Sequence, residues 1–210
     1  MDVVQSLREK SLLTAYDAGQ ETRLGMYRAI REYGERRLTR EVPAEQRGAL
    51  AARHALYHVE HAEAWSARTG GPRGRLALDA VEREIENLRR AHEWAVGQGA
   101  ADLAARIALA AADAMRVASP PRHLLPLLDA TLALLPADDA RRVVPLLVHR
   151  SAAAQAAGDW DAALDAAARA VDLARSAQDP GRLAIALVQC GEMRRSRGDL
   201  PGAIAAVEEA

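Results

Sequence analysis

The sequence has one cysteine, one lysine and no phenylalanine. The single cysteine, Cys190, excludes an internal disulfide, and its apolar neighbours indicate a buried thiol rather than a nucleophile. The formal net charge of −1 provides no overall attraction to nucleic acid or to an anionic membrane. No apolar run approaches the ~18 residues of a membrane span, and the first residues do not resemble a signal peptide. We therefore expect a cytoplasmic protein.

The motifs of common enzyme sites are also missing. The sequence contains no CxxC pair and no recognisable nucleophile–base pair. Its only lysine, Lys10, precedes a serine but follows no glycine-rich loop, so the sequence lacks a phosphate cradle of the Walker A type. We therefore predict that the chain is not an enzyme and carries no cofactor.

Alanine-rich stretches with helical spacing are abundant, and near the C-terminus they form a repeat. Gly158-Asp159-Trp160 returns forty residues later as Gly198-Asp199-Leu200, each time between two helical stretches. The glycine can adopt the left-handed conformation that ends a helix, and the aspartate can cap the next one. The repeat predicts stacked helical hairpins, an architecture that binds partners more often than it catalyses reactions. We expect Trp160 to lie buried between the helices of its hairpin.

The pattern divides the chain into three parts. Residues 1–42 contain two strand-like stretches, 11–16 and 22–27, joined by a turn at 17–20 and followed by a helix. Residues 43–137 form irregular helical hairpins, and residues 138–210 form the two repeats. Within the middle part, 78–96 is expected to be one helix with a charged, solvent-exposed face that carries Glu84, Glu86, Arg89, Arg90 and Glu93. The fold class is therefore mainly α, with one small β-hairpin.

The repeat turns resemble those of tetratricopeptide repeats, although forty residues separate them instead of the usual thirty-four. Several upstream segments look like parts of large bacterial regulators that combine an NB-ARC-type (STAND) ATPase, a winged helix and C-terminal tetratricopeptide repeats. These segments are residues 7–13, 23–27, 30–34, 53–57 and 84–91. The resemblance implies that 1–42 is a partial winged helix, that 138–210 holds two tetratricopeptide-like repeats, and that the ATPase module would precede residue 1. It also implies an interaction scaffold within a signal-transduction transcriptional regulator.

In such a scaffold the first helix of each hairpin lines a concave wall, where a protein, a peptide or a small-molecule effector is held. Alignment to the repeat pattern places four polar residues on this wall: Gln155, Glu192, Arg195 and Ser196. Binding there would shift the regulator from a closed to an open oligomeric state.

Two alternative functions remain open from the residues alone. One is DNA binding through the winged-helix segment, with Arg8 and Lys10 as phosphate contacts; nucleic acid is otherwise expected only through the parent protein. The other is a metal-binding protein centred on His54, His58 and His61, which recur on one face of the helix 43–69. Tyr57 and Trp65 share this face, which favours hydrogen-bonding roles for the histidines, and we predict no metal site.

The last helix carries an apolar stripe formed by Leu200, Ala203, Ile204 and Val207. In a stack of hairpins the next repeat covers part of this face. We expect this helix either to fray or to pair with a second copy of the chain.

Overall fold

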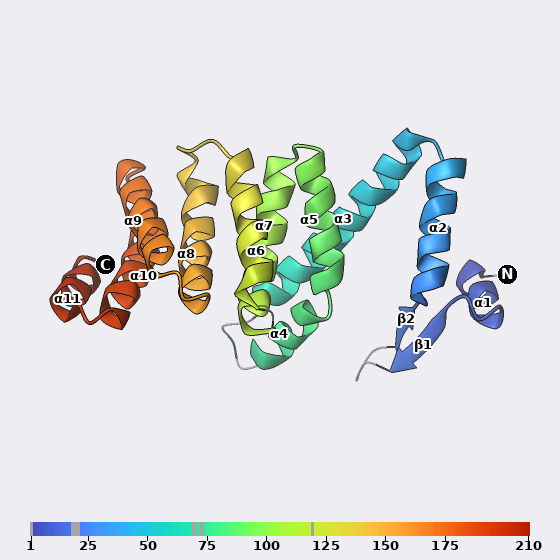
Figure 1. The fold of residues 1–210 in the computed structure, drawn as a ribbon, viewed down its shortest axis with the longest axis horizontal. Coiled ribbons are helices and arrows are strands. Elements are labelled where there is room, and N and C mark those ends of the chain that lie inside the picture. The colour runs from blue at the N-terminus through green and yellow to red at the C-terminus, as the bar shows by residue number, and fades with distance from the viewer. Residues whose placement is uncertain (1, 18–21, 69–70, 72–73, 119) are drawn as a thin grey trace. The chain divides into compact units, whose positions relative to one another are not determined.

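The computed structural model describes residues 2–17, 22–68, 71, 74–118 and 120–210 (Figure 1). Within these residues the chain forms eleven helices and one antiparallel pair of strands. The predicted mainly helical fold with one β-hairpin is therefore confirmed. The chain divides into two compact units, 1–50 and 51–210. The finer division at 42/43 and 137/138 stays a prediction.

The first unit holds the β-hairpin between two helices. In the hairpin Thr14 lies opposite Gly25, and Asp17 lies opposite Thr22. Asp2 caps the first helix, because its Oδ1 accepts a hydrogen bond of 3.1 Å from the amide of Val4. Both strands are shorter than expected, and residues 18–20 of the expected turn lie outside the described residues. The elements are α1 (Val3–Glu9), β1 (Thr14–Asp17), β2 (Thr22–Gly25) and α2 (Arg28–Glu41). Helix α3 (Ala44–Ser66) follows and runs across the limit between the units.

The second unit consists of helices that pack in two rows. Each helix from α5 to α11 contacts the next one, and alternate helices also touch, α6 with α8 and α8 with α10. This arrangement is consistent with a helical repeat. The helices are α4 (Gly74–Glu82), α5 (Ile85–Gly97), α6 (Ala101–Ala118), α7 (Pro121–Leu134), α8 (Ala140–Ala156), α9 (Trp160–Ser176), α10 (Pro180–Ser196) and α11 (Leu200–Glu209).

An aspartate caps each of the last four helices, at intervals of twenty residues. In every case Oδ1 accepts a hydrogen bond from the amide three residues later, with lengths of 3.3, 3.0, 3.0 and 3.0 Å. The caps are Asp139, Asp159, Asp179 and Asp199. The predicted caps at Asp159 and Asp199 are confirmed. The cap at Asp179 was not predicted, and α10 begins directly after it at Pro180.

The same backbone turn precedes three of these caps. Gly158 and Gly198 have φ values of 83° and 84°, which confirms their predicted left-handed conformation, and Gln178 takes a similar φ of 53°. In each turn the amide of the capping aspartate also donates to a carbonyl five residues back. Gln178 therefore occupies a position for which glycine is the favoured residue.

We expect Gln178→Gly to raise the free energy of unfolding by about 0.5–1 kcal/mol. Glycine has no Cβ to clash in the left-handed conformation, and this gain exceeds the extra freedom that it gives the unfolded chain. Urea denaturation followed by circular dichroism measures the change. Gly158→Ala is the matched control and should lower stability by about 1 kcal/mol. A loss of stability in Gln178→Gly would contradict the left-handed conformation of Gln178.

Alanine lets the helices of the second unit approach closely. In α9 the residues Ala163, Ala166, Ala167 and Ala170 are fully buried, so this helix presents little more than Cβ atoms to its neighbours. Larger side chains on the flanking helices fill the remaining space. At Gly191 of α10 an added Cβ would lie 3.3 Å from the carbonyl oxygen of Ala203. The core is therefore built on close backbone contact.

The prediction that Trp160 is buried is wrong, because its side chain is 36% exposed. Trp160 is the first residue of α9 and lies at the end of the hairpin. The contact between the helices is made further along by fully buried alanines, beginning at Ala163, which leave no room for an indole ring.

The prediction of one continuous helix over 78–96 is also wrong, because α4 ends at Glu82 and α5 begins at Ile85. At the break the amide of Glu84 donates to the carbonyl of Val81 over 2.9 Å. Glu84 was expected on the solvent face but is only 6% exposed. Its carboxylate accepts a hydrogen bond of 2.9 Å from Asn87 Nδ2 and lies 2.9 Å from Nδ1 of His58. The buried position of Glu84 thus involves a local hydrogen bond and a contact with a distant segment.

Candidate functional site

The four predicted wall residues lie on α8 and α10, which pack side by side. Nε2 of Gln155 donates to Oγ of Ser196 over 3.2 Å and links the two helices. Glu192 and Arg195 form a two-pronged ion pair on α10, with distances of 3.0 and 3.2 Å. This hydrogen bonding by Arg195 lowers the pKa of the Glu192 carboxyl. The structure thus brings the four residues together as two pairs.

A second polar link between α8 and α10 lies deeper. Nε2 of Gln189 donates to Oγ of Ser151 over 3.2 Å, and Ser151 is fully buried. Sequence reasoning missed both residues. They occupy an otherwise apolar interface, where an unsatisfied hydroxyl would be costly. The link therefore helps to fix the register of α8 against α10.

Near the N-terminal ends of α8 and α10 the surface of these two helices contains a groove of about 360 Å³. Ile185 of α10 lines it and is 57% exposed. Val144 and Pro145 of α8 form the opposite side, and Asp179, Gly181 and Arg182 complete the lining. An exposed isoleucine at the edge of an apolar groove is a suitable contact for an apolar side chain of a partner.

A polar hollow of about 400 Å³ adjoins this groove, because Arg182 lines both. Arg106 binds Glu63 through two hydrogen bonds of 2.8 and 2.7 Å, and Arg142 contacts two aspartates. Arg182 itself pairs with Asp179. Arg141 also lines the hollow, is exposed, and has no ion-pair partner within the part of the chain that the structure describes.

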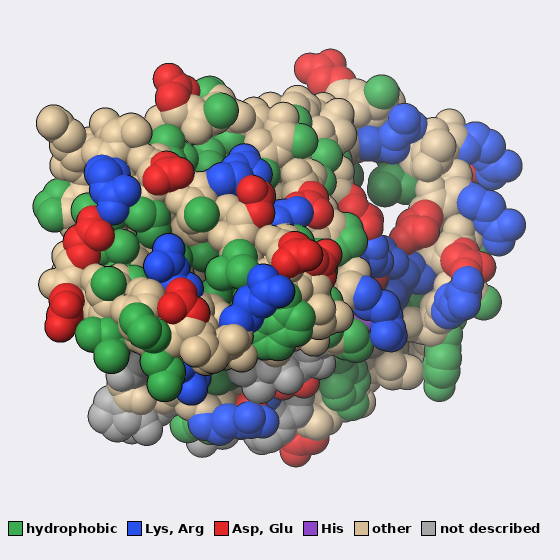
Figure 2. All heavy atoms as spheres, turned by 60° about the vertical axis from the view of Figure 1, so that its left-hand side comes forward, with side chains coloured by type: hydrophobic (Ala, Val, Ile, Leu, Met, Phe, Trp, Pro, Cys, Tyr) green, Lys and Arg blue, Asp and Glu red, His purple; other side chains and the backbone are tan. Residues whose placement is uncertain are grey.

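The groove and the hollow together provide apolar contact beside a cluster of guanidinium groups. Arginine binds carboxylates with two parallel hydrogen bonds, which gives directional recognition of an acidic side chain. The surface drawn in Figure 2 shows acidic and basic side chains interspersed, with no broad patch of one sign over the repeat helices. The arrangement therefore suits a short acidic and apolar segment better than a polyanion.

The three histidines of α3 make contacts with neighbouring side chains. His61 Nε2 accepts a hydrogen bond of 3.1 Å from Trp65 Nε1. Nδ1 of His58 lies 2.9 Å from Glu84, close enough for electrostatic attraction but without hydrogen-bond alignment. The ring of His54 lies 4.4 Å from that of His58, and burial lowers its pKa. Among the described residues, no group of three His, Cys, Asp or Glu side chains is placed to hold a metal ion.

Arg8 and Lys10, the residues of the DNA-binding alternative, are exposed at the C-terminal end of α1. The face of α11 is also exposed as expected, with Leu200, Ile204 and Val207 each more than half accessible to solvent, whereas Ala203 is buried. Pairing with a second copy through this face stays a prediction. Among the helices of the described residues, none is both long enough and apolar enough to cross a membrane.

Comparison with known proteins gives no relative: no family model matches the chain, and no curated protein matches it. The resemblance to the STAND regulators therefore stays an expectation from the sequence.

Proposed function

We propose that the chain is an interaction scaffold, the helical-repeat part of a STAND-type signal-transduction regulator. In this proposal α1, the β-hairpin and α2 are the downstream part of a winged helix, and the repeat helices hold a partner. The observation that carries the binding role is the row formed by α8 and α10. These first helices of successive hairpins pack side by side and expose an apolar groove beside arginines.

The side chains exposed on α8 and α10 indicate which chemical groups a partner would present. An apolar side chain would contact Ile185 and Pro145, and an acidic group next to it would bind Arg141 or Arg182. Arg141 is the strongest candidate for the acidic contact, because it does not have to leave an existing ion pair. We therefore propose a peptide segment in which an apolar residue and an acidic residue are neighbours. A partner segment of this kind binds by adding contacts along the helices, without a chemical reaction.

Selection from a phage-displayed peptide library tests the proposal without assuming a partner. We expect enriched peptides to combine an apolar and an acidic residue. Ile185→Lys and Arg141→Glu should each weaken binding of a selected peptide by at least about tenfold, a loss of about 1.4 kcal/mol.

The matched controls carry the same changes on other helices. Ile204→Lys on α11 and Arg169→Glu on α9 alter residues with similar exposure outside the groove. Both should bind the peptide as the unchanged chain does. Failure to enrich any peptide, or equal losses in the test and control variants, would refute the proposed site.

A further inference from the structure

A second and larger hollow of about 650 Å³ lies outside the α8–α10 row, between α5 and α7. Its floor is provided by Met115 of α6, which is 2% exposed, and by Leu127 of α7, which is 6% exposed. Ile85 and Val96 of α5 form one wall and are half-buried, and Ala130 lines the wall contributed by α7. The volume lies within the roughly 300–1,000 Å³ typical of small-molecule sites.

The one polar side chain deep in this hollow already has its hydrogen-bond partner. Nε2 of His92 lies 2.7 Å from Oγ1 of Thr131, and that hydroxyl donates its proton to the carbonyl of Leu127 over 2.8 Å. His92 must therefore donate to Thr131. Burial lowers the pKa of His92 to about 4, so the ring is neutral at pH 7. A ligand that enters the hollow thus meets an apolar floor and an uncharged imidazole.

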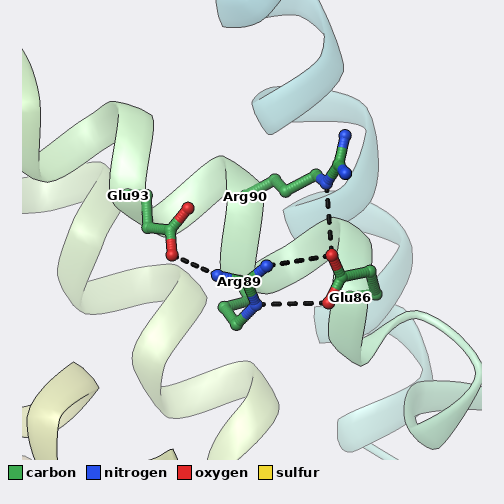
Figure 3. A network of polar contacts seen from close by, with 4 residues as sticks. All are labelled: Glu86, Arg89, Arg90 and Glu93. Carbon is green, nitrogen blue, oxygen red and sulfur yellow. Dashed lines mark hydrogen bonds and ion pairs between the residues drawn. The ribbon is translucent and has the colours of Figure 1, made fainter. Parts of the chain in front are cut away.

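The rim carries charged groups that pair with one another. Arg89 is held between two carboxylates, with contacts of 2.9 and 3.2 Å to Glu86 and a further contact to Glu93 (Figure 3). Among the lining residues, two carboxylates thus face one guanidinium. Arg90, which does not line the hollow, also contacts Glu86 over 3.2 Å. Because the two carboxylates and the two guanidinium groups pair with one another, the rim offers little to a charged group and favours a neutral one.

We propose that this hollow binds a neutral, hydrophobic small molecule of the size of a two- or three-ring aromatic compound. The apolar floor would take the rings, and the carboxylate of Glu93 would accept a hydrogen bond from an N–H group at the rim. The site is distinct from the peptide groove, because no residue lines both. The two proposals therefore fail independently.

Two fluorescent probes that share one skeleton test the size and the charge preference together. N-phenyl-1-naphthylamine is neutral, and 8-anilino-1-naphthalenesulfonate is its sulfonated, anionic counterpart. We expect saturable binding of the neutral probe at one site and binding of the anionic probe that is weaker by about tenfold or more. The guanidinium groups of the rim are already paired, so the sulfonate would lose hydration beside the apolar floor without gaining an ion-pair partner.

Substitutions then locate the bound probe. Ala130→Phe fills the hollow and should abolish the saturable signal, whereas Ala168→Phe on the exposed side of α9 should leave it unchanged. Val207→Lys places a charge in the exposed apolar face of α11 and should also leave the signal unchanged. Glu93→Lys should reduce the preference for the neutral probe at least fivefold, and Asp165→Lys on α9 should not. Circular dichroism shows whether each variant is folded, and Glu93→Lys provides the test if Ala130→Phe is not.

Nuclear magnetic resonance of methionine methyl groups gives an independent readout. The chain has four methionines, so the Met115 signal can be assigned with Met115→Leu. The neutral probe should shift the Met115 signal and leave that of Met193 in place. Unchanged binding in Ala130→Phe, or loss of binding in Val207→Lys, would overturn the proposal, as would the absence of saturable binding.

Discussion

Leu147→Ala is expected to lower the free energy of unfolding by about 2–5 kcal/mol. Leu147 is 1% exposed and lies on α8, which packs against α7, α9 and α10. The truncation removes apolar contact and leaves a cavity. The buried positions of α9 are mostly alanine, whose short side chains cannot move to fill that cavity. The cost should therefore lie well above that of an average substitution.

Urea denaturation at pH 7, followed by circular dichroism, measures this loss. Leu200→Ala is the matched control, because it makes the same chemical change on α11 at a side chain that is 57% exposed. We expect the control to cost less than about 1 kcal/mol. If both variants lost similar stability, the placement of Leu147 in the core would be wrong.

The features that the sequence predicted well are those encoded by neighbouring residues. A glycine followed by an aspartate carries both the left-handed turn and the helix cap, and the turns at Gly158 and Gly198 are as expected. The turn between α9 and α10 was missed because Gln178 stands where the other two turns have glycine. The aspartates alone would have revealed it, since Asp139, Asp159, Asp179 and Asp199 recur every twenty residues. The unit of the pattern is therefore one helix, and two such units make the forty-residue repeat.

The features that the sequence did not predict depend on contacts between distant segments. Glu84 belongs to a charged stretch that predicts a solvent-exposed acid, but its carboxylate is buried close to His58, which lies twenty-six residues earlier in the chain. Trp160 was wrongly expected to be buried, because a large aromatic side chain normally is. Its position at the start of α9, ahead of a run of buried alanines, keeps it at the surface.

The candidate sites also depend on contacts between segments that are distant in the sequence. The expected wall residues Gln155 and Arg195 occupy one position of the forty-residue repeat, and a role of these residues in binding stays a prediction. The groove combines α8 with α10, and the apolar hollow combines α5, α6 and α7. No single stretch of sequence contains the residues of either. From the sequence alone, Met115 is expected to be a core residue, and the carboxylates of the rim are expected to lie on an ordinary charged helix face. Their meeting at one opening is a property of the packing.

Acidification is expected to destabilise the unchanged chain more than the variant His92→Gln. Burial lowers the pKa of His92 from 6.5 to about 4 in the folded state, whereas the unfolded chain has the ordinary value. Between these two values the unfolded state binds more protons than the folded state. The free energy of unfolding therefore falls as the pH falls through this window, and the contribution of His92 is fully present only above pH 6.5. The loss amounts to at most about 3 kcal/mol, since one pKa unit corresponds to about 1.4 kcal/mol.

Glutamine at position 92 keeps a donor for Thr131 but cannot take up a proton in this range. Burial also lowers the pKa values of His54 and His149, but these groups are present in both proteins, so the comparison isolates His92. Urea denaturation at several pH values between 7 and 4 gives the free energy of unfolding of each protein. The unchanged chain should lose stability relative to His92→Gln as the pH falls, by roughly 2–3 kcal/mol at pH 4. A difference between the two proteins that stays constant with pH would show that the imidazole is accessible to protons in the folded state, and that it does not lie against the floor of the hollow between α5 and α7.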